Sequence, residues 1–272
     1  MSRQSDILML LKKTPMTQAQ LAQSIYRDRN HSPYIYSALM TLLKSGQIAR
    51  SDARPAVYSL PGSPASVTLM KKTSLTPRSI REITVKNLEA AHRQVLATDH
   101  YGQEDALLAD CIRQYPDNTD PVIVAMKIGL IDITNSTNIS RHKSRISVAE
   151  LAKHIVGIQH LDQRIRQGDP QVVNDIANCN GQINLFSFAS KYCCYHNLHR
   201  DGRDDYSIFD NVLKRTLPLY FGDISVREIE QWRKNLQYEK YNAYIAEKLD
   251  MLSIHTAFRR REFDHFMWFN NR

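Results

Sequence analysis

Apolar side chains recur at helical spacing in three segments near the N-terminus, residues 5–13, 17–26 and 32–46. Thr17 is predicted to be the N-cap of the second segment, and a Ser-Pro pair opens the third, where Pro suits the first helical position. Two short strands, 47–50 and 56–60, follow around a basic turn. The pattern therefore predicts three helices and a β-hairpin.

The remainder of the chain, residues 91–272, is predicted to be almost entirely helical, without an alternating strand pattern. Ser147 is expected to cap a helix that continues to Gly168. Asp210 is expected to open a helix that ends near residue 220. Residues 132–138 are predicted to form a polar loop. Further helices are predicted over 171–178, 185–197, 226–236, 240–252 and 258–269.

The fold class is thus predicted to be mainly α, in two domains. Residues 1–62 form the first domain, and residues 91–272 form an all-helical second domain. Between them, residues 63–90 are predicted to be a basic linker and arm, because they start with a Pro, Gly and Ser-rich stretch.

The first domain resembles the winged helix-turn-helix family over residues 4–61, in the phrases TPMTQAQLAQSI, SPYIYSALMTLLKSGQIARSD and AVYSL. In that family the third helix enters the major groove and the wing contacts the backbone. The resemblance implies that Ser32, Tyr34, Tyr36 and Ser37 face DNA and that Arg50 and Arg54 contact phosphate. The alternative is a winged helix used for dimerisation or protein contact.

The charge distribution favours a nucleic acid as the partner, and the resemblance to winged helices implies that it is double-stranded DNA. The net charge is +8, and residues 1–90 hold 13 Lys and Arg against 5 Asp and Glu, whereas residues 91–272 hold 23 of each. A basic module beside a neutral body is typical of nucleic-acid binding. An inert basic surface is the alternative. Additional phosphate-contact candidates are Lys71, Lys72, Arg141, Lys143 and Arg145.

Four Cys in 272 residues, two of them adjacent, do not form a disulfide scaffold and fit a reducing cytosol. The most apolar run, residues 122–133, is too short to span a bilayer. We therefore expect a cytoplasmic, nucleoid-associated protein with no membrane contact. The oligomeric state is left open.

The densest group of chemically capable residues lies in segment 184–216. Lys191 lies on one predicted helix and Asp210 opens the next, 19 residues later, within SIFDNVLKR. This arrangement resembles the helix-hairpin-helix DNA glycosylases, the superfamily of endonuclease III and 8-oxoguanine glycosylase. In that family a catalytic Lys precedes, by about nineteen residues, an Asp in the context Val-Pro-Val-Asp-x-x-Val-x-Arg.

The resemblance implies that Lys191 attacks the sugar carbon C1′ and that Asp210 stabilises the developing positive charge. The target base must first be flipped out of the duplex. Phe188, Tyr192 and Tyr195 are the candidates for the base pocket, although aromatics at helical spacing are more typical of a core. Lys191 as a snorkelling side chain and Asp210 as a simple N-cap are the structural alternatives.

No metal or cofactor is predicted. Cys193, Cys194, His196 and His199 crowd onto one helix and its end, whereas a structural zinc site needs separated pairs of ligands. Trp268 is expected to anchor the core rather than to stack on a base.

The sequence thus predicts a DNA glycosylase, with or without lyase activity, that serves repair or phage defence. One rival is a winged-helix regulator whose helical domain binds a ligand or dimerises. Another is a glycosylase fold that binds DNA without cutting it, because the Gly-rich hairpin that precedes the catalytic Lys in the family is absent here.

Overall fold

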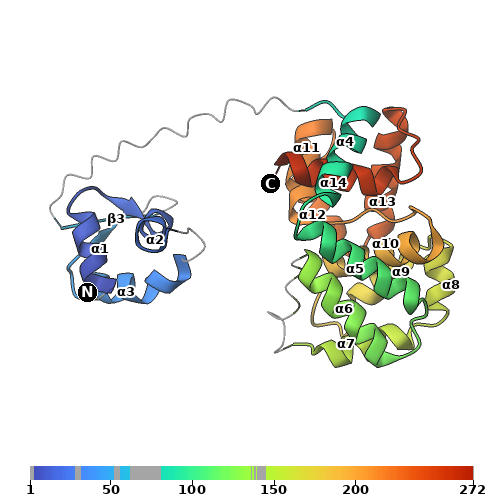
Figure 1. Cartoon of the computed structure of the whole chain (residues 1–272), viewed down its shortest axis with the longest axis horizontal. Helices are drawn as coiled ribbons and strands as arrows, with labels where there is room; N and C mark the ends of the chain where they lie inside the picture. The colour runs from blue at the N-terminus through green and yellow to red at the C-terminus, as the bar shows by residue number, and fades with distance from the viewer. Residues whose placement is uncertain are drawn as a thin grey trace. The chain divides into compact units, whose positions relative to one another are not determined.

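The computed structural model describes residues 3–27, 32–51, 56–61, 81–135, 137, 139 and 145–271, with the side chains of 32–34 left undescribed. The chain divides into two compact units, Met1–Ser79 and Ile80–Arg272. Both are built mainly of helices, and a single small sheet occurs in the described part of the first (Figure 1). The prediction of a mainly helical fold is confirmed.

The first unit combines helices with a three-stranded antiparallel sheet of order β1-β3-β2. Tyr58 at its centre lies opposite Met16 and Arg50. Thr17 caps α2 in a capping box with Gln20, as predicted, but the two-residue strand β1 was not foreseen. The elements are α1 (Arg3–Leu11), β1 (Met16–Thr17), α2 (Gln18–Tyr26), α3 (Ser32–Lys44), β2 (Ala49–Arg50) and β3 (Val57–Ser59).

The second unit is arranged around helix α10, which is buried on every side from Phe188 to Asn197 and packs against α5, α6, α8 and α9. The elements are α4 (Val85–Leu96), α5 (Tyr101–Gln114), α6 (Pro121–Asn135), α7 (Val148–Gly157), α8 (Leu161–Arg166), α9 (Gln171–Ala177), α10 (Phe186–Asp201), α11 (Asn211–Phe221), α12 (Val226–Lys234), α13 (Tyr238–Met251) and α14 (Arg259–Asn271).

Helix α14 organises the other half of this unit, where it packs against α4, α11 and α13. Within the unit, α4 and α11–α14 gather at one end and α5–α10 at the other (Figure 1). The chain passes between the two ends twice, through the short α4–α5 connection and again between α10 and α11. The α4–α5 connection is tight, because a side-chain carbon at Gly102 would collide with the carbonyl oxygen of Leu96.

Three boundaries differ from the sequence predictions. The second unit starts before residue 91, because α4 begins at Val85 and belongs to it. The single helix expected after Ser147 is two helices, because His160 adopts a left-handed conformation (φ 53°) between α7 and α8. The expected polar loop at 132–138 begins as the last turn of α6, which ends at Asn135.

Candidate active site

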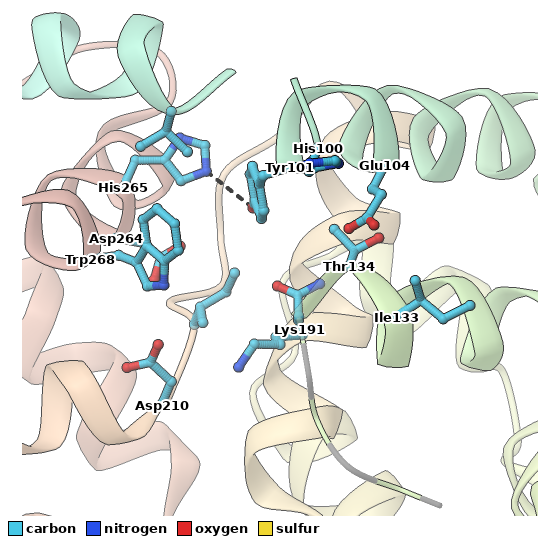
Figure 2. Close-up of a pocket in the computed structure, with 13 residues that line it drawn as sticks. His100, Tyr101, Glu104, Ile133, Thr134, Lys191, Asp210, Asp264, His265 and Trp268 are labelled. Atoms are coloured by element: carbon cyan, nitrogen blue, oxygen red, sulfur yellow. Dashed lines mark hydrogen bonds between the residues drawn. The ribbon is translucent and has the colours of Figure 1, made fainter. Parts of the chain in front are cut away.

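A cavity of about 430 Å³ is lined by both ends of the second unit (Figure 2). The end of α4 and the start of α5 meet the last turn of α6 there, together with α10, the segment before α11 and helix α14. The lining residues are Val95, His100, Tyr101, Glu104, Ile133, Thr134, Asn135, Lys191, Ile208, Asp210, Asp264, His265 and Trp268.

Lys191 is the cation of this cavity. Its side chain is 5% exposed, and its Nζ donates to Ser187 Oγ at 3.1 Å and to the Phe209 carbonyl oxygen at 3.3 Å. Burial lowers the pKa of Lys191, and the carboxylates of Asp210 and Asp264 oppose that shift. The amine therefore reaches its neutral, nucleophilic form at a lower pH than an exposed lysine does.

Asp210 lies at the start of α11, where its Oδ1 accepts a hydrogen bond from the Leu213 amide at 2.8 Å. It is thus the predicted N-cap, and it also lines the cavity. Figure 2 shows the Lys191 ammonium and the Asp210 carboxylate facing the same space from opposite sides. Among the described residues, these two do not form an ion pair within 4.0 Å.

The position of Asp210 is fixed by the segment that precedes it. Tyr238 and Tyr241 of α13 donate to the carbonyl oxygens of Ser207 and Ile208 at 2.8 and 2.7 Å. The Phe209 amide donates to Ser190 Oγ of α10 at 3.0 Å. Ser190 is next to Lys191 on α10, and Phe209 is next to Asp210. This hydrogen bond therefore fixes the position of the aspartate relative to the lysine.

Asp264 is a second carboxylate in the cavity, and it belongs to a buried network centred on Arg261. The Arg261 guanidinium forms ion pairs with Asp264 at 2.9 Å and with Asp105 at 3.0 Å, and it donates to Tyr101 Oη at 2.6 Å. Burial raises the pKa of Asp264 to about 6, although Arg261 opposes the shift. Asp264 therefore changes its protonation close to neutral pH.

Aromatic rings form one wall of the cavity. Tyr101 and Trp268 lie with their ring centroids 5.8 Å apart and tilted by 31°, and the His265 ring meets Tyr101 edge to face. Trp268 is half-buried rather than a core anchor, which corrects the sequence prediction. Helix α14 supplies both Asp264 and Trp268, four positions apart on one face.

The three aromatics predicted to line a base pocket do not line this cavity. Phe188, Tyr192 and Tyr195 are buried in the core around α10. Tyr192 Oη donates to Asn118 Oδ1 at 2.7 Å, away from the cavity. Tyr195 comes closest, since its hydroxyl donates to the cavity residue Asn135 at 3.1 Å. These three aromatics pack in the core, whereas Lys191 is the residue of α10 that lines the cavity.

Some of the predicted DNA-contact residues are described. Tyr36 on α3 is 53% exposed, and Ser37, Arg50 and Arg145 are exposed as well. In the second unit, Asn180 Nδ2 donates to the Arg145 carbonyl oxygen at 2.9 Å. The predicted contacts Arg54, Lys71, Lys72, Arg141 and Lys143, and the side chains of Ser32 and Tyr34, lie outside the described residues.

The Cys and His residues of α10 are part of the core. Cys193, Cys194 and His196 are buried, and burial raises the pKa of Cys194 to about 12. Over the described ranges, no cluster of three or more His, Cys, Asp or Glu side chains is arranged to hold a metal ion. A search of the same ranges for a helix long and apolar enough to cross a membrane found none.

Sequence reasoning missed Tyr101, Asp264 and His265, which come from helices 73–90 residues away from Lys191. The available signal was the C-terminal FRRREFDHFMWFNNR, in which polar residues interrupt the aromatic ones. A helix with Asp264 and Trp268 on one face, and with an Arg able to neutralise the Asp, is unusual for a purely packing helix.

The comparisons with known proteins give one family match and one relative. A family model described as an N-terminal domain, HI_0787_N, matches residues 84–203. An uncharacterized protein of Haemophilus influenzae is 28% identical over 155 residues, which cover 55% of this chain and 68% of that protein. No solved structure matches the chain. The family match lies within the second unit and includes Lys191 but ends before Asp210.

Proposed function

We propose that the protein is a DNA glycosylase whose first unit binds double-stranded DNA and whose second unit excises a flipped base. The observation that carries this proposal is that Lys191 and Asp210 line one cavity and face each other across it. A buried lysine with a lowered pKa, in a cavity that also holds a carboxylate, is suited to nucleophilic attack.

The element order of the first unit supports its assignment as a winged helix. Three helices and an antiparallel sheet occur in the order α1-β1-α2-α3-β2-β3. Helix α3, the equivalent of the recognition helix, presents Tyr36 and Ser37 to solvent. Arg50 is exposed on β2, where the wing begins, so it is available to a phosphate.

The proposed chemistry starts from the neutral Lys191 amine. Its lone pair attacks C1′ of the flipped nucleotide, and the bond from C1′ to the base nitrogen breaks. The base leaves with that electron pair and takes up a proton. Loss of a proton from nitrogen and opening of the sugar ring then give a Schiff base, from which a lyase step can follow. Asp210 stabilises the positive charge that develops on the sugar.

The cavity also offers groups that suit a nucleobase. Trp268 and Tyr101 provide aromatic surface for stacking, and Asp264 provides a hydrogen-bonding edge that is a donor or an acceptor according to its protonation. A cavity of about 430 Å³ has the size of a small-molecule site. These features support a base as the occupant.

Duplexes that each carry one oxidised, deaminated or alkylated base test this proposal under single-turnover conditions. Alkali converts each excised site into a strand break, which a denaturing gel resolves. We expect breaks in at least one duplex with the wild-type protein and none with Lys191→Ala. Tight DNA binding without any break would favour a fold that binds DNA but does not cut it. The same result would fit a winged-helix regulator, whereas absence of both would favour a winged helix used for dimerisation or protein contact.

A further inference from the structure

Two histidines connect the cavity to the outside of the second unit. His92 on α4 is half-exposed, whereas His265 on α14 is buried and lines the cavity. Their Nδ1 atoms lie 2.9 Å apart, and the rings stack with centroids 4.7 Å apart and an interplanar angle of 27°. Because a hydrogen bond between two Nδ1 atoms needs a single proton, one ring donates and the other accepts.

The hydrogen bonds beyond this pair run in one direction. His265 Nε2 lies 3.4 Å from Tyr101 Oη, which also accepts from Arg261. Tyr195 donates its own proton to Asn135 Oδ1, so Tyr101 donates at the 3.2 Å contact between the two hydroxyls. Because the single Tyr101 proton is used at Tyr195, Tyr101 can only accept at its contact with His265. His265 therefore carries its proton on Nε2, and His92 donates to His265 Nδ1.

The charges around the pair favour neutral imidazoles. Burial lowers the pKa of both histidines, and the Arg261 guanidinium lowers them further. Arg93 of α4 acts in the same direction on His92, and Asp105 of α5 opposes it. A neutral imidazole can accept a proton at one nitrogen while it releases one from the other.

We propose that His92 and His265 relay a proton from solvent to the base that leaves the cavity. This inference rests on the proposed glycosylase function. When the bond to C1′ breaks, the base nitrogen keeps the electron pair and takes the proton that His265 Nε2 shares with Tyr101 Oη before the reaction. In the same step His265 Nδ1 takes the proton of His92 Nδ1, and His92 Nε2 takes one from water. One proton thus enters from solvent, and both rings end neutral.

His92→Phe tests the relay, because it retains a stacked ring outside the cavity but removes the proton path. With the duplex that the wild-type protein cleaves, we expect the single-turnover rate of base release to fall about 100-fold. DNA affinity should stay unchanged. His255→Asn serves as the matched control. His255 is exposed in the loop between α13 and α14, so this variant should behave as the wild-type protein does.

His92→Ala separates proton transfer from packing, because imidazole added to the solution can occupy the space that the ring leaves. We expect imidazole to restore most of the rate. A wild-type rate in His92→Phe, or a slow His92→Ala that imidazole does not restore, would overturn the relay and leave the glycosylase function intact. If the wild-type protein releases no base from any duplex, the function and the relay fall together.

Discussion

Two buried lysines in the second unit, Lys127 and Lys191, have similar hydrogen bonds, but only Lys191 faces the cavity. Lys127 on α6 is fully buried, and its Nζ donates to the Asp117 carbonyl oxygen at 3.0 Å and to Asn118 Oδ1 at 2.9 Å. Lys191 on α10 is nearly as buried and also has two neutral acceptors. Burial lowers the pKa of both amines, to about 8 for Lys127.

The surroundings of the two amines differ. Lys127 belongs to a closed network in which Asn118 also accepts from Tyr192 and donates to Asp162, and Arg200 in turn pairs with Asp162. Lys191 instead faces a cavity of about 430 Å³ that is also lined by three carboxylates, Glu104, Asp210 and Asp264. A lowered lysine pKa is therefore not by itself a sign of catalysis, and access to a substrate-sized space is the feature that distinguishes Lys191.

The largest expected effect concerns this pair. Lys191→Ala should lower the single-turnover rate of base release by about 1,000-fold or more, because the nucleophile is lost. Lys127→Met, which keeps a long apolar stem, should retain the wild-type rate. Rates on the responsive duplex check both expectations. An equal loss of rate in the two variants would contradict the comparison. It would mean that removing either buried lysine slows the reaction, whether or not that lysine faces the cavity.

Asp210→Asn should lower the same rate by about 100-fold, because the charge that stabilises the developing cation is removed. Asn is as good an N-cap as Asp, so the midpoint of thermal unfolding should stay close to that of the wild-type protein. The rate of base release and the midpoint of thermal unfolding together separate a role in the reaction from a role as a helix cap. If Asp210→Asn lowers the midpoint of thermal unfolding but leaves the rate of base release unchanged, Asp210 is a capping residue only.

Helix caps could be predicted from the sequence, whereas the break between α7 and α8 could not. The caps at Thr17, Ser147 and Asp210 were predictable, since capping depends on short-range hydrogen bonds that local sequence encodes. The break at His160 was not, because apolar residues at helical spacing continue from Leu151 through Ile165 across it. Local periodicity records which face is apolar, not where the backbone turns.

The site was predictable only in its central pair. Lys191 and Asp210 are close in sequence and carried by one motif, so the family resemblance located both. The remaining cavity residues depend on which helices pack together, as Asp264 of α14 and Tyr101 of α5 show. The aromatics of α10 were misassigned because a fully surrounded helix has no polar stripe that reveals its orientation.

A smaller effect, on the free energy of unfolding, is expected at Asp264, the carboxylate that lies in the cavity with Lys191. Its pKa of about 6 lies above the ordinary value of an Asp, so the folded state holds this proton more tightly than the unfolded state does. Relative to Asp264→Asn, the wild-type protein should lose about 2 kcal/mol of unfolding free energy as the pH rises from 4 to 7. Urea unfolding at several pH values measures this difference, and a constant difference would contradict the assignment.

The smallest effect is expected in the first unit, which the comparison of the two lysines leaves out. Arg50→Ala should weaken duplex binding by a few-fold and make the salt dependence of the binding constant slightly shallower, because one phosphate contact is lost. The rate of base release from saturated protein should not change. Titration of labelled duplex at several salt concentrations checks this. A changed rate at saturation would mean that the wing contributes to the chemistry.

Reduction with borohydride tests the central claim most directly, because it converts a Schiff base into a stable covalent bond. The wild-type protein, Lys191→Ala and Lys127→Met are each mixed with the responsive duplex and with a duplex that contains an abasic site, and the products are resolved on a denaturing gel. We expect a protein–DNA adduct with the wild-type protein and with Lys127→Met, and none with Lys191→Ala. An adduct that persists in Lys191→Ala, or no adduct from wild-type protein that binds the duplex tightly, would contradict Lys191 as the nucleophile.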